Sequence, residues 1–177
     1  FVSRDYHFNK VKTFHHMMDE RTQEEPQAWD IEGATHRAYF KIEELLEFVR
    51  AASSSEEEFQ QSLASMHAAL DKAAEKVRQK TPAQKDLIGQ VDALIDTLYF
   101  TYGSFALMGV DPERIFDIVH EANMGKVFPD GKAHFDPVTH KILKPDDWEE
   151  KYAPEPAIRK ELQRQLKAYE RHKERNK

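Results

Sequence analysis

The fold is decided by the stretch from residue 87 to residue 109, which has the sequence LIGQVDALIDTLYFTYGSFALMG. Its apolar residues recur at helical spacing over a broad face, which predicts a long helix whose face must be covered. Gly109 follows the last apolar residue, and glycine is the usual residue just past a helix end. Asp92 and Asp96 stand four residues apart on this helix, so both carboxylates lie on one side of it. Aspartate is a poor interior helix former, which indicates that these two residues serve a function.

A second acidic group lies about fifty residues earlier. Glu43, Glu44 and Glu47 share one side of a helix expected over residues 35–52. If helix packing brought both groups together, five like charges would repel one another unless cations bound them. Carboxylate oxygens suit Mg²⁺ or Mn²⁺, so the sequence predicts a divalent metal site made of Glu43, Glu44, Glu47, Asp92 and Asp96. A solvated face of an ordinary amphipathic helix is the alternative.

Further helical patterns are expected at about residues 5–20, 55–80, 83–108, 112–124 and 156–173. Thr35, Ser55 (with Glu58 three residues later) and Thr81 (before Pro82) are the expected helix N-caps. Residues 125–156 carry several prolines, so they predict an irregular basic arm, with a short hairpin joining 133–135 to 141–143. The fold class is therefore all-α: one domain over 1–177, with a helical core at about 36–126, the arm at about 127–155 and a final helix at about 156–173.

Composition excludes several classes of protein. The chain has 177 residues, of which 40% are hydrophobic and 33% charged, with only 6 Gly, as expected for a mostly helical domain. No apolar run approaches the roughly 18 residues of a membrane span. The net charge of −6 disfavours non-specific binding to nucleic acid. The absence of cysteine excludes disulfides, thiol nucleophiles and cysteine zinc sites. Because residues 1–5 also lack the apolar stretch of a secretion signal, we expect a cytoplasmic protein.

Basic and amide side chains in and after the 112–124 helix are candidate contacts for a polyanionic ligand. Glycine-rich phosphate loops are absent from the sequence, so a nucleotide would be held through metal and cations. Lysines are more often solvated surface residues, and Trp148 and Phe128 either stack on a base or fix the arm to the bundle. The candidate contacts are Asn123, Lys126, Lys132 and Lys144.

Five segments together resemble the MazG-like all-α nucleoside triphosphate pyrophosphohydrolases. They are IEELLE (42–47), DALIDTLYFTYG (92–103), VHEANMGK (119–126), DGK (130–132) and ILKPDDW (142–148), and the resemblance covers roughly residues 36–150. In that family an EExxE motif on one helix and an ExxD-type motif on a later helix bind Mg²⁺. The resemblance therefore implies Glu43, Glu44, Glu47 and Asp96 as ligands. Ala93 stands where the second motif has glutamate, and Asp92 stands one residue earlier.

The resemblance also implies a reaction. A water activated by Mg²⁺ attacks the α-phosphorus of a (d)NTP, dUTP and noncanonical nucleotides being candidates, and the products are a nucleoside monophosphate and pyrophosphate. Glu44 or Glu47 would take the proton of the water. Asn123 and Lys126 would contact the phosphates, and Lys126 and Lys144 would stabilise the leaving pyrophosphate.

Members of this family assemble as dimers or dimers of dimers with the substrate site near a subunit interface, so a homodimer or a dimer of dimers is expected here. The broad apolar face of the 83–108 helix is compatible with such a partner. Two other functions stay open. One is a phosphoribosyl-ATP pyrophosphohydrolase, ranked lower because the arm after residue 125 resembles the MazG-like branch. The other is a noncatalytic helical binding or assembly module.

Overall fold

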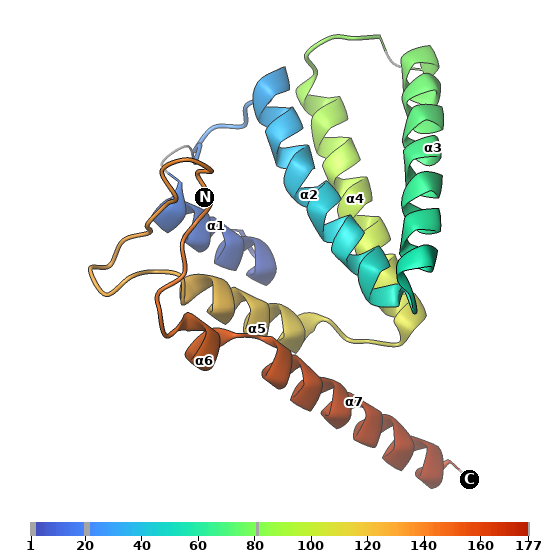
Figure 1. The fold of residues 1–177 in the computed structure, drawn as a ribbon, viewed down its shortest axis with the longest axis vertical. Helices are drawn as coiled ribbons and strands as arrows, with labels where there is room; N and C mark the ends of the chain where they lie inside the picture. Colours follow the sequence, from blue (N-terminus) through green and yellow to red (C-terminus); the bar gives the residue numbers. More distant parts are fainter. Residues whose placement is uncertain (1–2, 20–21, 81, 177) are drawn as a thin grey trace. The chain divides into compact units, whose positions relative to one another are not determined.

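The structure, a computed structural model, describes residues 3–19, 22–80 and 82–176. Within these residues the fold is all-α, as predicted, with one isolated β-bridge between Phe135 and Ile142 (Figure 1). None of the helices in the described residues is both long enough and apolar enough to cross a membrane. In chain order the helices are α1 (Tyr6–Met18), α2 (Ile31–Ala52), α3 (Glu56–Lys80), α4 (Leu87–Met108), α5 (Glu113–Met124), α6 (Trp148–Tyr152) and α7 (Glu155–Arg175).

The chain divides into two compact units. Unit 1 comprises Phe1–Glu24 and Thr97–Lys177, and unit 2 comprises Glu25–Asp96. The boundary lies inside α4, so unit 2 holds α2, α3 and the first part of α4. That the two units act as one domain stays a prediction.

Helix α2 begins earlier than its sequence pattern indicated. Its N-cap is Asp30, whose carboxylate accepts a hydrogen bond from the Gly33 backbone N–H at 2.7 Å. Thr35, the expected N-cap, lies inside the helix, where its hydroxyl donates to the Ile31 carbonyl at 2.7 Å. The prediction at Thr35 is wrong because Asp30 satisfies an end N–H one turn earlier, and Gly33 is tolerated within the first turn.

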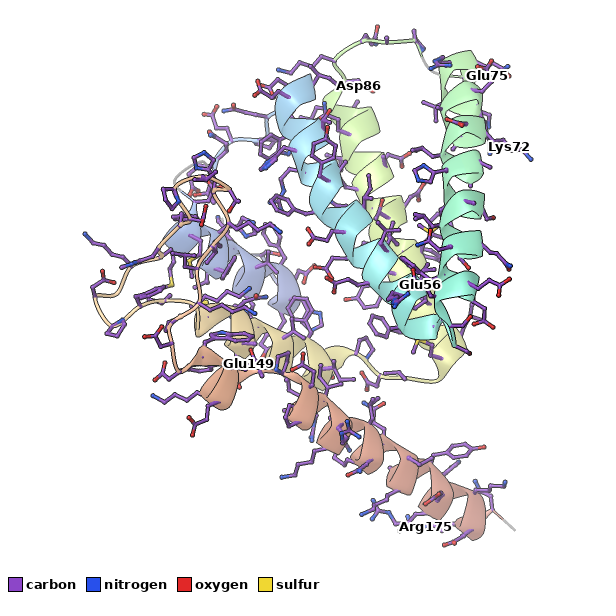
Figure 2. The ribbon with its side chains drawn as sticks, viewed as in Figure 1. Glu56, Lys72, Glu75, Asp86, Glu149 and Arg175 are labelled. Atoms are coloured by element: carbon purple, nitrogen blue, oxygen red, sulfur yellow. The ribbon has the colours of Figure 1, made fainter. Side chains whose placement is uncertain are left out.

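The other two helices of unit 2 begin at side-chain caps. At the start of α3 the Glu58 N–H donates to Ser55 Oγ at 3.1 Å, which confirms the predicted cap. The Glu58 carboxylate in turn accepts from the Ser54 N–H at 2.6 Å. Asp86, labelled at the start of α4 in Figure 2, accepts from the N–H groups of Ile88 (3.1 Å) and Gly89 (2.9 Å). Helix α4 therefore begins at Leu87, later than expected, and Thr81 lies outside the described residues.

Unit 2 buries none of its described side chains. Helix α2 packs against α3, yet large apolar residues stay open: Tyr39 is 62% exposed, Leu45 54% and Val91 51%. A helical unit with no buried side chain lacks the apolar core that normally stabilises a fold. Large apolar side chains of unit 2 therefore stay exposed among the described residues.

Unit 1, by contrast, contains all three buried apolar residues of the described chain: Met18, Ala122 and Trp148. Helix α1 packs on α5, where the His7 ring stacks on Phe116 with centroids 4.2 Å apart. Helix α7 also packs on α5. Gln165 of α7 donates to the Asp111 carbonyl (2.9 Å) and accepts from the Asp111 N–H (3.0 Å).

The arm between α5 and α6 is held by turns. The Asp136 carboxylate accepts from the N–H groups of Val138 (2.8 Å) and Thr139 (2.6 Å), and the predicted hairpin is reduced to the single Phe135–Ile142 bridge. The arm was expected to stay irregular to residue 155. Helix α6 was missed because five residues are too few to show a helical period.

Candidate functional site

The five predicted metal ligands all lie on helices of unit 2. Glu43, Glu44 and Glu47 lie in the middle of α2, and Asp92 and Asp96 lie in the first part of α4. All five are exposed. As carboxylates on helices they have the chemistry that Mg²⁺ or Mn²⁺ prefers, so the donor set fits such an ion.

Their positions along the helices differ, however. The Trp29 N–H donates to Gln90 Oε1 at 2.9 Å, and Gln90 Nε2 donates to the Trp29 carbonyl at 3.1 Å, so the beginnings of α2 and α4 meet. From there α2 and α4 run in the same direction (Figure 1). At 1.5 Å per residue, the glutamates lie roughly 20 Å along α2, whereas the aspartates lie within roughly 10 Å of Gln90.

Within one copy of the chain, the glutamates and the aspartates therefore lie at different heights, that is, at different distances along the helices from the Trp29–Gln90 pair. Consistent with this, no three His, Asp or Glu side chains lie close enough to hold a metal ion anywhere in residues 3–19, 22–80 and 82–176. The assignment of Glu43, Glu44, Glu47, Asp92 and Asp96 as ligands of one metal site stays a prediction.

The predicted phosphate contacts lie in unit 1, at the end of α5. Lys126 Nζ donates to Asn123 Oδ1 at 2.9 Å, so these two side chains converge. Lys144 lies with its Nζ 4.1 Å from the centre of the Trp148 ring, a cation–π contact. Lys132 is exposed in a turn, where its carbonyl accepts from the Phe128 N–H at 2.9 Å. The structure thus links Asn123 to Lys126, and Lys144 to Trp148.

The last four carbonyls of α5, which an α-helix leaves without partners, each receive a donor. Three donors are backbone N–H groups of the following residues, and the fourth is the indole of Trp148 in α6. The bonds are Gly125 N–H to Glu121 (2.9 Å), Trp148 Nε1–H to Ala122 (2.8 Å), Lys126 N–H to Asn123 (3.1 Å) and Val127 N–H to Met124 (3.2 Å).

Trp148 therefore fixes the arm to α5, one of the two roles that the sequence left open. Phe128 stacks on His134 with ring centroids 4.0 Å apart. Sequence reasoning missed Tyr152, whose ring lies against Gly125. Trp148 and Tyr152 stand four residues apart and so share one side of α6, but this relation becomes a signal only once the helix is known.

Ser104 and His120 are two polar residues outside the predicted site. The Ser104 hydroxyl donates to the Phe100 carbonyl at 3.1 Å within α4, which is ordinary for serine in a helix. Burial, with the nearby Lys10 ammonium, lowers the pKa of His120 below its usual value. Neither residue has the surroundings of a nucleophile and its base.

Comparison with known proteins assigns the family. Residues 11–123 match the family model described as phosphoribosyl-ATP pyrophosphohydrolase. The chain is also 36% identical to a protein from Exiguobacterium sp. 255-15, provisionally named an NTP pyrophosphohydrolase, whose crystal structure superposes with a TM-score of 0.84 over 94% of this chain and 99% of that one. No curated protein matches. The chain belongs to the phosphoribosyl-ATP pyrophosphohydrolase family, within the MazG-like superfamily of all-α pyrophosphohydrolases.

Proposed function

We propose that this protein is a Mg²⁺-dependent nucleoside triphosphate pyrophosphohydrolase that converts (d)NTPs, dUTP or noncanonical nucleotides among them, to nucleoside monophosphates and pyrophosphate. The observation that carries the proposal is membership in a pyrophosphohydrolase family, in a chain that keeps two carboxylate groups on exposed helix faces. We place the activity in the cytoplasm, in keeping with a chain that has no cysteine.

The active form that we propose is a homo-oligomer, a dimer or a dimer of dimers. Two observations support it. The apolar faces of α2 and of the first part of α4 lack cover within unit 2, and one chain leaves its acidic groups at different heights. A two-fold axis perpendicular to these helices would make the helices of a second copy run in the opposite direction, so the two heights would be exchanged between copies. It would therefore bring Glu43, Glu44 and Glu47 of one copy level with the two aspartates of the other.

In this assembly Glu43, Glu44, Glu47, Asp92 and Asp96 would hold the metal. A bound Mg²⁺ would supply charge to the phosphate oxygens and favour ionisation of the attacking water. Glu44 or Glu47 would accept the proton of that water. Asn123, Lys126, Lys132 and Lys144 would bind phosphate oxygens, and the lysines would stabilise the negative charge that develops on departing pyrophosphate.

Phosphoribosyl-ATP is the second candidate substrate, because the matching family model carries that name. Its hydrolysis breaks the same type of bond and releases pyrophosphate as well. The Exiguobacterium protein, whose similarity covers 94% of this chain, is instead named for NTPs. A direct comparison of the two substrates decides between these readings.

The test is pyrophosphate release from a panel of dNTPs, NTPs, noncanonical nucleotides and phosphoribosyl-ATP, with Mg²⁺ or Mn²⁺ and after chelation. We expect release that depends on the metal and favours one triphosphate class. Absence of release from the whole panel at saturating metal would overturn the proposal. If Mg²⁺ and Mn²⁺ then also failed to raise the melting temperature, the acids would be a solvated face and the chain a noncatalytic helical module.

A further inference from the structure

The short helix α6 touches the end of α5 at two points and the Lys144 ammonium at a third. We propose that α6 is a positioning element for an anion site at the end of α5. In this arrangement Trp148 and Tyr152 hold the backbone that orients Asn123 and Lys126, and Trp148 also holds Lys144 near the same helix end. The inference deepens the proposed function and rests on it, because it takes these side chains to be phosphate contacts.

The first contact maintains a tightened last turn. The Lys126 N–H bonds the Asn123 carbonyl three residues back, rather than the Ala122 carbonyl four residues back. The Ala122 carbonyl is thereby left to the Trp148 indole, which donates to it at 2.8 Å. Both residues are buried, and a buried carbonyl without a donor is costly. The Trp148 N–H thus stabilises the turn in which Lys126 Nζ reaches Asn123 Oδ1.

The second contact sets how closely the two helices approach. A Cβ atom on Gly125 would lie 2.5 Å from Cγ of Tyr152, far inside van der Waals contact. The Gly125 backbone, at φ −65° and ψ −9°, is right-handed and open to any residue. Glycine is therefore needed here for space alone, because the Tyr152 ring lies directly against the chain between Asn123 and Lys126.

The third contact supplies positive charge at the carbonyl end of α5, where the helix itself disfavours an anion. The carbonyl end of a helix is its negative end and disfavours phosphate, unlike the N-terminal end. An anion site there depends on cations held in place. The Trp148 ring, fixed by its bond to Ala122, holds the Lys144 ammonium 4.1 Å from its centre, and Lys126 is the first residue past the Gly125 cap.

The experiment compares two variants of the full chain with a matched control. Trp148→Phe keeps a ring but loses the N–H, and Gly125→Ala adds the clashing methyl group. The control is Met18→Ala, which removes another buried side chain of unit 1, one that belongs to α1. Calorimetry with inorganic pyrophosphate and Mg²⁺ measures anion affinity, and steady-state kinetics give KM and kcat. Thermal melting compares the loss of stability in each variant with that in the Met18→Ala control.

For Trp148→Phe and Gly125→Ala we expect the pyrophosphate Kd to rise about tenfold and the nucleotide kcat/KM to fall about tenfold, because Lys126 and Lys144 are proposed to contact the phosphates in the bound nucleotide and as pyrophosphate leaves. Met18→Ala should keep both constants despite a lower melting temperature. Adding Tyr152→Ala to Gly125→Ala makes room for the methyl group. The double variant should therefore bind pyrophosphate no more weakly than Tyr152→Ala alone, which is a non-additive result.

Each outcome is decisive. Equal shifts in Trp148→Phe and Met18→Ala, or no shift in either, would overturn the positioning role and leave the proposed function standing. A wild-type chain that does not bind pyrophosphate would remove the anion site, and the inference with it. If pyrophosphate binds as described but no nucleotide is hydrolysed, the inference stands and the proposed function fails.

Discussion

The two units of the chain differ in how far contacts within one chain supply hydrogen-bond partners and bury side chains. At the α5–α6 end of unit 1, every carbonyl of the last helical turn has a donor and the Trp148 ring is only 6% exposed. In unit 2, no described side chain is buried, and the apolar residues of α2 alternate with the predicted ligands. Unit 1 is built from contacts within one chain. Unit 2 leaves large apolar side chains exposed, and these are the faces that the proposed second copy would cover.

The largest effect should come from the carboxylates of unit 2. Glu47→Gln and Asp96→Asn each remove one charge from the proposed metal site, and each should lower pyrophosphate release on the order of 10²–10⁴-fold with the helical content unchanged. Release assays and circular dichroism measure the two quantities. The control is Glu75→Gln in α3, an exposed acid outside the proposed site, which should leave turnover unchanged. Full turnover in both variants would remove these residues from the mechanism.

The next effect should be on assembly. Leu45→Lys puts a charge on the apolar face of α2, where Leu45 is 54% exposed in a single chain. If a second copy covers this face, the substitution should weaken association by about thirtyfold or more, as measured by analytical ultracentrifugation. Val138→Lys is the control, because Val138 is 82% exposed in a turn of unit 1. A Leu45→Lys protein that associates like the wild type would place the interface elsewhere.

A smaller pair of effects concerns one hydrogen-bonding arrangement that occurs in both units. Gln90 and Gln165 each pair with both the N–H and the carbonyl of one residue, Trp29 and Asp111 respectively. Replacing either glutamine by alanine should cost about 1–3 kcal/mol in the free energy of unfolding, measured with urea. If a second copy covers unit 2, the urea midpoint of Gln90→Ala should rise with protein concentration, because association would stabilise the folded state alone. A midpoint that does not depend on concentration would contradict the proposed cover of unit 2.

The smallest effect concerns acid stability. Hydrogen bonds from Arg164 and Gln165 lower the pKa of Glu161 from 4.5 to about 2. Because the folded-state pKa is the lower one, ionised Glu161 stabilises the fold fully above about pH 4.5, and this stabilisation is lost as the pH falls toward 2. In Glu161→Gln the melting temperature should therefore vary less with pH between 4.5 and 2 than in the wild type. An unchanged pH profile would show that the pair contributes nothing measurable.

Local sequence patterns predicted much of this structure. The all-α class, the Ser55 cap and the helical placement of both acidic groups follow from spacing alone, because they depend on residues three or four apart. The start of α2 was missed because a single cap residue, Asp30, gives no periodic pattern. Helix α6 was missed because the five residues Trp148–Tyr152 are too few to show a helical period. The family resemblance added a function that spacing could not.

The heights of the two acidic groups lay beyond any local pattern. They depend on direction: α3, with 25 residues, lies between α2 and α4 in the chain, and the two outer helices run the same way. The expectation that helix packing gathers five carboxylates considered each helix separately. Direction and partner chains decide whether residues on two helices meet, and neither is encoded in the spacing of residues along one helix.

The distribution of tryptophan has a practical consequence. The chain has two, and one falls in each unit: Trp29, which is 40% exposed, and Trp148, which is 6% exposed. Their fluorescence should differ in colour, the sheltered indole emitting at shorter wavelength. Replacing one or the other by phenylalanine gives each unit its own optical signal. Melting curves recorded from the two signals would then show whether the chain unfolds in one cooperative step or loosens at Glu25–Asp96 first.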